Sequence, residues 1–307
     1  MSPPIRVGSR GSDLALIQAR EVMNALDEPA ELVIIETHGD RVTDRPLSQV
    51  GGAGLFIKEI ESALIDDRID LAVHSMKDVP SVVPEGLSLA ATLARLDARD
   101  ALVSKTAPTI AALSHGAHIA TGSLRRRSQL LAIRPDLVVD DLRGNVGTRL
   151  DKFDASSWDA VVLAAAGLMR LGLEARIRAK LPVDEMIPAV GQGALAIETR
   201  TDDRRVRSLV EALNHPATQR AVACERAFLG RLEGGCQVPI GAFAEIEQQS
   251  LRLLGYVGSV DGSRRLRREA TGALEAPEAL GLALAEQMLE AGAGEIIGEI
   301  AGSDANR

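Results

Sequence analysis

The sequence predicts an α/β protein built from two similar halves, followed by a small α+β domain. Short apolar runs alternate with helical periods over the first two-thirds of the chain, and this pattern restarts near residue 101. Three strand-like runs then follow one another in the last third. Alternation of strands and helices is typical of parallel α/β sheets, whereas consecutive strands beside helices are typical of α+β domains. The length of 307 residues allows two or three domains.

The first half opens with a strand at Ile5–Val7 and a helix that Ser12 can cap, continuing to Leu26. A second helix is predicted at Leu55–Asp66, because its apolar residues recur on one helical face. The remaining strands of this half are predicted at Leu32–Glu36, Leu71–Val73 and Leu87–Ala91.

The second half repeats the alternation, and both halves are expected to form parallel sheets. Its strands are predicted at Ala101–Val103, His118–Ala120, Leu137–Asp141 and Ala160–Ala164. Its helices are predicted at Ser123–Ile133, Val146–Phe153 and Ala165–Leu171. Arg95–Asp100 and Met186–Val190 are the expected crossovers between the halves, and a strand at Ala194–Glu198 returns the chain to the first half.

The last third begins with a helix at Thr218–Gly230, which leads into a glycine-rich loop around Cys236. Strands are predicted at Ala242–Ile246, Leu251–Val257 and Arg265–Thr271, and a closing helix at Pro277–Ala291. The tail Gly302–Arg307 is expected to fray.

Composition excludes several classes of function. The net charge is −8, and only four Phe, one Trp and one Tyr are present, which argues against a nucleic-acid partner. No apolar run approaches the roughly 18–20 residues that span a bilayer. The N-terminus lacks the pattern of a secretory signal, so a cytoplasmic protein without a membrane partner is expected. Two cysteines cannot form a disulfide framework, and neither CxxC nor HExxH is present to indicate a metal site.

Two strand–helix junctions share one design. Gly8–Ser12 and Thr121–Arg126 each place glycine, a hydroxyl and arginine at a helix N-terminus. Free backbone N–H groups and the helix dipole make such ends anion sites. Glycine and serine also cap helices for structural reasons, so the recurring arginine is what favours a ligand site.

Arginine is unusually frequent, since lysine occurs at only five of the 35 basic positions. Genomic base composition can account for most of this excess, but the location of the arginines carries information. Arg204, Arg205 and Arg207 are expected on an outward helix face. A second set lies near strand ends, where ligands of parallel sheets bind: Arg10, Arg125, Arg126, Arg143, Arg149 and, further on, Arg170. The ligand implied carries several carboxylates or phosphates.

Two further residues indicate chemistry. Asp78 follows Lys77 in a strand-end loop, and an aspartate in an arginine-rich cleft is suited to an N–H group or a developing positive charge. Cys236 lies among glycines that leave its sulfur accessible, which favours a nucleophile or a covalent attachment point. His74 is expected to be structural, and Cys224 to be a buried helical cysteine.

These segments resemble the porphobilinogen deaminase family over nearly the whole chain. The matching segments, in family order, are HSMKDVP at 74–80, SLRR at 123–126, RGN with TR at 143–149, AAGL with Arg170, PAVGQG at 188–193, and Glu225-Arg226 with GGCQVPIG at 234–241. The sequence departs from many relatives in having Gln49 and Ala53 where lysines are common, and Gly122 where serine is common.

The resemblance implies an enzyme that condenses four porphobilinogen molecules head to tail, with loss of ammonia, and releases hydroxymethylbilane by hydrolysis. It implies a dipyrromethane cofactor joined to Cys236 by a thioether, and a cytoplasmic monomer. The implied fold has two periplasmic-binding-protein-like (type II) lobes with a hinge, plus a small α+β C-terminal domain with a three-stranded antiparallel sheet. The corresponding domains are residues 1–96 plus 190–213, residues 97–189, and residues 216–302.

The resemblance also implies roles for individual residues. Asp78 matches the family's catalytic aspartate. Together with Cys236, the cofactor would be bound by Lys77, Asp78, Thr121, Ser123, Arg125, Arg126, Asn145 and Arg149. The substrate or the growing chain would be bound by Arg10, Ser12, Arg143, Arg170 and Gln192.

Two alternatives from other classes remain at this stage. A non-catalytic carboxylate-binding protein or sensor domain would explain the arginines, but neither Asp78 nor Cys236. A cysteine hydrolase would explain Cys236, but no base partner is visible near it in the sequence. The intact mass discriminates, because a binding protein has the mass of its sequence and a deaminase is heavier by two linked pyrroles.

Overall fold

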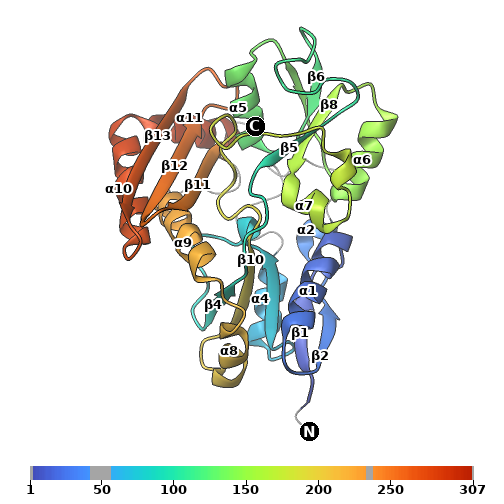
Figure 1. Cartoon of the computed structure of the whole chain (residues 1–307), viewed down its shortest axis with the longest axis vertical. Coiled ribbons are helices and arrows are strands. Elements are labelled where there is room, and N and C mark those ends of the chain that lie inside the picture. Colours follow the sequence, from blue (N-terminus) through green and yellow to red (C-terminus); the bar gives the residue numbers. More distant parts are fainter. Residues whose placement is uncertain (1–2, 42–56, 233–237, 306–307) are drawn as a thin grey trace.

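The structure, a computed structural model, describes residues 3–41, 57–232 and 238–305. Figure 1 shows two α/β lobes, one above the other, with a smaller unit beside the upper lobe. Gln49, Ala53 and Cys236 lie outside the described residues.

The lower lobe is built on a five-stranded sheet with the order β2-β1-β3-β10-β4. Its strands are β1 (Ile5–Ser9), β2 (Ala30–Ile34), β3 (Leu71–Ser75), β4 (Leu87–Thr92) and β10 (Leu195–Arg200). Its helices are α1 (Asp13–Ala25), α2 (His38–Arg41), α4 (Lys58–Ile65) and α8 (Arg204–Glu211), and a short 3₁₀ helix, η1 (Met76–Asp78), follows β3. Ile5, Leu71 and Ile197 lie in its core.

The upper lobe has a second five-stranded sheet with the order β7-β6-β8-β5-β9. Its strands are β5 (Asp100–Ser104), β6 (His118–Ala120), β7 (Val138–Asp140), β8 (Ala160–Ala164) and β9 (Ala179–Lys180). Its helices are α5 (Leu124–Ile133), α6 (Val146–Ala155) and α7 (Ala165–Arg170), followed by the 3₁₀ helix η2 (Glu174–Arg176).

The expectation of purely parallel sheets is wrong at one position in each lobe. β10 runs antiparallel to β3 and β4, and β5 runs antiparallel to β8 and β9. Each is the first strand after a crossover, so it enters directly from the other lobe without the helical connection that parallel neighbours need. The predicted return of the chain to the first sheet is confirmed by β10. The domain boundaries stay a prediction.

The third unit is an antiparallel sheet covered by helices. Strands β11 (Ile240–Glu247), β12 (Ser250–Gly258) and β13 (Arg265–Ala273) form a meander. Helices α9 (Pro216–Arg231) and α10 (Pro277–Glu290) contribute Phe228 and Leu284 to its core. The expected frayed tail from Gly302 is wrong in part, because α11 (Ala293–Ala305) includes residues 302–305 and is anchored by the buried Ile296.

Candidate functional site

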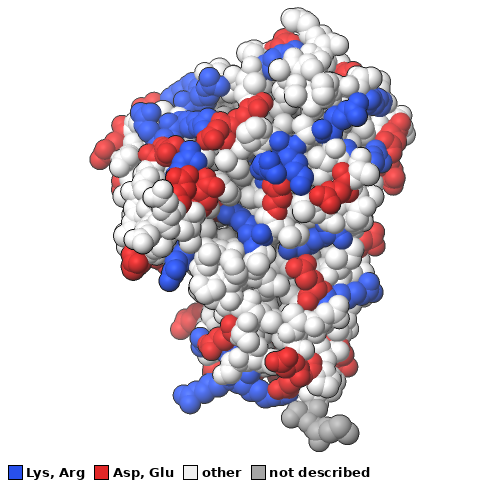
Figure 2. All heavy atoms as spheres, in the orientation of Figure 1, with Lys and Arg blue, Asp and Glu red and all other residues white. Residues whose placement is uncertain are grey.

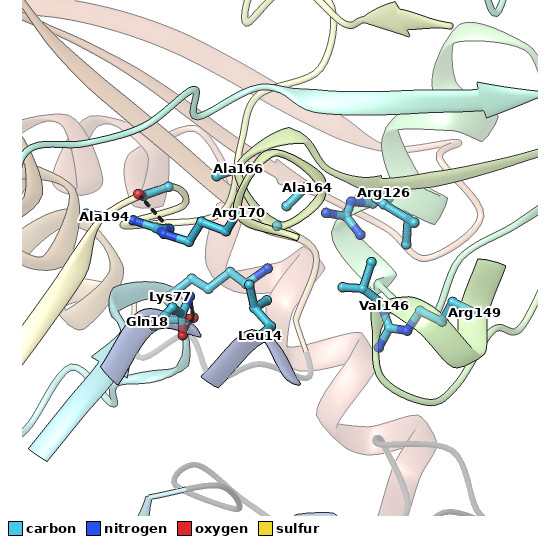
Figure 3. A pocket seen from close by; sticks show the side chains of 14 residues that line it. Leu14, Gln18, Lys77, Arg126, Val146, Arg149, Ala164, Ala166, Arg170 and Ala194 are labelled. Atoms are coloured by element: carbon cyan, nitrogen blue, oxygen red, sulfur yellow. Dashed lines mark hydrogen bonds between the residues drawn. The ribbon is translucent and has the colours of Figure 1, made fainter. Parts of the chain in front are cut away.

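An open pocket lies where the two lobes meet. Residues of α1, the end of β3, α5, α6, α7 and the second crossover contribute to its wall. The lining side chains and backbone are those of Leu14, Gln18, Ser75, Lys77, Arg126, Val146, Arg149, Leu163, Ala164, Ala166, Gly167, Arg170, Gly193 and Ala194. Figure 3 shows Lys77 between Arg170 on one side and Arg126 and Arg149 on the other. Four cations from both lobes therefore share one pocket.

Three of the helices that begin near this pocket, α1, α5 and α6, are capped by side chains, and the first two lie at the junctions that share glycine, a hydroxyl and arginine. Ser12 accepts a hydrogen bond from Ala15 N at 3.4 Å, and Ser123 accepts one from Arg126 N at 3.4 Å. Asn145 Oδ1 accepts one from Thr148 N at 2.9 Å. Thr121 is buried, and its Oγ1 accepts from Ser123 N at 3.3 Å. Each oxygen thus satisfies one of its helix's first N–H groups, and further ligand roles of these residues stay predictions.

Lys77 and Arg149 are cations without an acidic ion-pair partner within 4 Å among the described residues. Burial, together with the charges of Arg126 and Arg149, lowers the pKa of Lys77 to about 8, although Asp78 opposes the shift. Burial and the charge of Arg126 likewise lower the pKa of Arg149 to about 10, with Asp78 again opposing. Cations held this close together are suited to bind an anion, which would relieve their repulsion.

A buried carboxylate that the sequence analysis missed organises the two adjacent arginines. Asp100, at the start of β5, receives Nε and Nη2 of Arg126 at 2.9 and 2.8 Å, and Arg125 Nη1 lies 2.8 Å from its other oxygen. Burial favours the neutral form of Asp100, but the two guanidinium groups outweigh it and lower its pKa. Asp100 therefore stays charged and fixes both side chains. The signal for Asp100 in the sequence was a charged residue directly before the apolar run Ala101–Val103.

Gln192 belongs to the same network. Its Nε2 donates to Ala98 O at 2.7 Å and to Asp100 Oδ1 at 2.9 Å, and the residue is almost completely buried. Gln192 follows the second crossover, and these hydrogen bonds connect it to the first crossover. Its contact with substrate stays a prediction.

The loop that carries Asp78 is held from two sides. Behind it, Ser75 Oγ and the Gln18 amide exchange hydrogen bonds at 2.9 and 3.2 Å. After it, Arg226 of α9 donates to the carbonyl oxygens of Pro80 at 2.7 Å and Val79 at 3.2 Å. Asp78 ends η1, half-buried, where its charge acts on Lys77 and Arg149. Neither the role of Gln18 nor the contact of Arg226 with this loop was predicted from the sequence.

The remaining candidates lie near the pocket or apart from it. Arg10 follows β1, and Arg143 is close enough to Arg149 to lower its pKa. His74 is buried, with Nε2 3.0 Å from Glu198 Oε2, which confirms its structural position. Cys224 is buried in α9 as predicted, and burial raises the pKa of its thiol to about 12, so it is unreactive near neutral pH.

Acidic and basic side chains are interspersed over the face seen in Figure 2. Across residues 3–41, 57–232 and 238–305, no helix combines the length and apolar character needed to cross a bilayer. The same residues contain no cluster of three or more His, Cys, Asp or Glu side chains placed to hold a metal ion.

Comparison with known proteins gives two family matches. Residues 5–208 match the family model described as porphobilinogen deaminase, dipyromethane cofactor binding domain, and residues 219–290 match porphobilinogen deaminase, C-terminal domain.

The solved structures that match this chain include a lipoprotein and a VFT2 domain. A putative methionine-binding lipoprotein from Bacillus subtilis has 14% identity and a TM-score of 0.42, covering 69% of this chain and 90% of its own. The VFT2 domain of BvgS from Bordetella pertussis has 15% identity and a TM-score of 0.40, covering 73% of this chain and 92% of its own.

Proposed function

The chain belongs to the porphobilinogen deaminase family, and we propose that Asp78, Cys236 and the cations of the interlobe pocket carry that family's reaction in this protein. The enzyme condenses porphobilinogen molecules head to tail in tetrapyrrole biosynthesis and uses a dipyrromethane cofactor. The observation that best supports the residue assignment is the convergence of Lys77, Arg126, Arg149 and Arg170 on one pocket.

The pocket fits a group that carries several carboxylates. Lys77 and Arg149 have lowered pKa values because burial and neighbouring cations disfavour their charge. Nη2 of Arg170, which lines the pocket, is buried without a hydrogen-bond partner among the described residues. Leaving such a donor unpaired costs about 1–3 kcal/mol, which a carboxylate ligand would recover. Each pyrrole of the cofactor and substrate carries an acetate and a propionate, so the chemistry of the ligand matches these donors.

The proposed division of binding follows the family resemblance. Lys77, Thr121, Ser123, Arg125, Arg126, Asn145 and Arg149 hold the cofactor, which is attached at Cys236. Arg10, Ser12, Arg143, Arg170 and Gln192 hold the substrate or the growing chain. The dipyrromethane supplies the nucleophilic pyrrole carbon to which the first substrate unit is joined.

Asp78 acts on the pyrrole nitrogens. Loss of ammonia leaves the substrate electron-poor, and attack by a second pyrrole then places positive charge on that ring. The Asp78 carboxylate stabilises this charge and assists removal of the proton. The contacts of Gln18 to Ser75, and of Arg226 to Val79 and Pro80, support this role because they hold the loop on both sides of Asp78.

The function is tested by supplying purified protein with porphobilinogen. Release of ammonia together with formation of hydroxymethylbilane is the expected result. A carboxylate-binding protein, the alternative, would bind porphobilinogen and release no ammonia.

The protein is further proposed to act as a monomer in the cytoplasm. The support for a monomer is that one chain supplies both walls of the described pocket. The support for the compartment is the buried free thiol of Cys224, which fits a reducing environment.

Arg149→Leu is expected to impair cofactor assembly or chain elongation severely. Removing one charged contact to a buried anion costs about 2–5 kcal/mol, which corresponds to a loss of affinity of about 30-fold to several thousand-fold. Arg204→Leu is the matched control, because Arg204 is exposed on α8, outside the pocket. Product formation is measured for both variants. Equal activity would show that location in the pocket does not identify the ligand-binding arginines.

The pH dependence of loading is expected to report on Lys77. The pKa of its ammonium is about 8, so the charge that binds a carboxylate is present below pH 8 and is lost as the pH rises through that value. Affinity of the cofactor-free protein for preassembled tetrapyrrole should therefore fall by up to about tenfold per pH unit above pH 8. Lys77→Arg should flatten this decline, because a guanidinium stays charged. Binding followed by fluorescence or mass that is equally pH-dependent in both proteins would contradict the assignment.

A further inference from the structure

Arg170 is paired with an acidic side chain from the opposite lobe. It ends α7, in the upper lobe, while Glu21 lies on α1, in the lower lobe. Nε of Arg170 donates to Glu21 Oε2 at 3.0 Å. The Arg170 side chain is 5% exposed, whereas that of Glu21 is 40% exposed. One partner of this ion pair is therefore fixed in the wall, and the other borders solvent.

The other cations of the pocket are arranged differently. Lys77 and Arg149 have no acidic ion-pair partner within 4 Å among the described residues. Arg126 is paired with Asp100 at 2.8 Å, but Asp100 is completely buried and cannot leave without stranding a charge in the protein interior. Glu21 is 40% exposed and can rotate into water once a ligand carboxylate takes its place, because the buried Arg170 then keeps an anionic partner. Among these cations, Arg170 is the one whose counter-ion can exchange.

The surroundings of Arg170 favour exchange with a ligand. Nη1 makes a long hydrogen bond of 3.4 Å to Gly193 O, and Nη2 is buried with no hydrogen-bond partner among the described residues. Gln18, one turn before Glu21 on α1, lines the same pocket (Figure 3). A carboxylate in this part of the pocket would meet a donor that is already desolvated, beside a counter-ion that can move away.

Building on the proposed function, we propose that Glu21 is the exchange partner of Arg170 and sets how tightly substrate carboxylates are held. Glu21 neutralises Arg170 until a substrate carboxylate arrives, and it returns when that pyrrole unit moves on. A growing chain must bind and leave the same cation repeatedly. A returning internal carboxylate lowers the cost of leaving, because the buried arginine is not left unpaired.

The test is Glu21→Gln, which preserves the size of the side chain and removes its charge. The KM for porphobilinogen is expected to fall about three- to tenfold, because the incoming carboxylate no longer competes with an internal one. Turnover is expected to fall as well, and intact mass should show protein with incomplete chains accumulating after a brief exposure to substrate. An unchanged or higher KM, or a wild-type distribution of bound chain lengths, would overturn the proposal.

Two comparisons separate the exchange from a general charge effect. Glu28→Gln changes the net charge equally, but Glu28 pairs with Arg205 within the lower lobe, so the KM should stay at the wild-type value. In an Arg170→Gln background, Glu21→Gln should no longer lower the KM. A similar fall in either case would contradict the exchange. Wild-type protein that fails to convert porphobilinogen in the same assay would refute the proposed function instead.

Discussion

Asp78→Asn is expected to abolish useful turnover while leaving the protein folded and able to bind porphobilinogen. The amide preserves the shape of the side chain but cannot stabilise a positively charged pyrrole or accept its proton. Electrostatic and acid–base contributions of one such group are worth about 10²- to 10⁴-fold in rate. The measurement is single-turnover release of ammonia from variant protein that has been loaded with cofactor by adding preassembled tetrapyrrole.

The controls separate chemistry from binding. Asp78→Glu should retain partial turnover, because the charge survives and its reach changes by one methylene. Asp66→Asn removes an exposed carboxylate at the end of α4, in the same lobe, and should behave like wild type. Wild-type release of ammonia by Asp78→Asn would remove Asp78 from the mechanism and leave it as a structural loop residue.

Cys236→Ser is expected to lose deaminase activity completely. A serine hydroxyl cannot form the thioether, so the cofactor would have no covalent attachment and chain growth would have no primer. Intact mass of the denatured variant should equal the mass of its sequence, and addition of porphobilinogen should leave that mass unchanged. A cofactor-sized adduct that persists on Cys236→Ser would exclude Cys236 as the attachment point.

Cys224→Ser is the matched control, because it makes the same change at the other cysteine. Cys224 lies on α9 and is buried. A serine hydroxyl at this position can donate a hydrogen bond to a backbone carbonyl of the preceding helical turn. The variant should therefore carry the cofactor and remain active. Loss of the adduct from Cys224→Ser alone would reverse the assignment of the two cysteines.

The parts of the site that the sequence predicted are those with local signals. Ser12, Ser123 and Asn145 each lie directly before a helix, and all three cap it in the structure. Lys77 and Arg149 come from separate strand–helix junctions, yet both line the pocket, because ligands of α/β sheets bind beyond the strand ends. Local signals placed Ser12 before a helix and Arg149 near a strand end, whereas the family resemblance singled out Lys77 and Asn145 as binding residues.

The features that were not predicted from the sequence depend on contacts between residues far apart in the chain. In the sequence, Asp100 does not differ from other charged residues at strand ends. Its role is visible only in the fold, which places Arg125 and Arg126 against it. Glu21 lay on an ordinary amphipathic helix, and its pairing with Arg170 exists only because the lobes meet. The antiparallel entry of β5 and β10 could not be read from periodicity, since a buried strand has the same apolar pattern in either direction.

We infer that this chain builds its product on a primer attached to itself, and the intact mass of the denatured wild-type protein reveals whether that primer is present. Purified protein should be heavier than its sequence by two linked pyrroles. Brief exposure to porphobilinogen should add a ladder of one to four further pyrrole units, which disappears as product is released. A protein that has the mass of its sequence, and that gains no mass on exposure to porphobilinogen, would contradict the account.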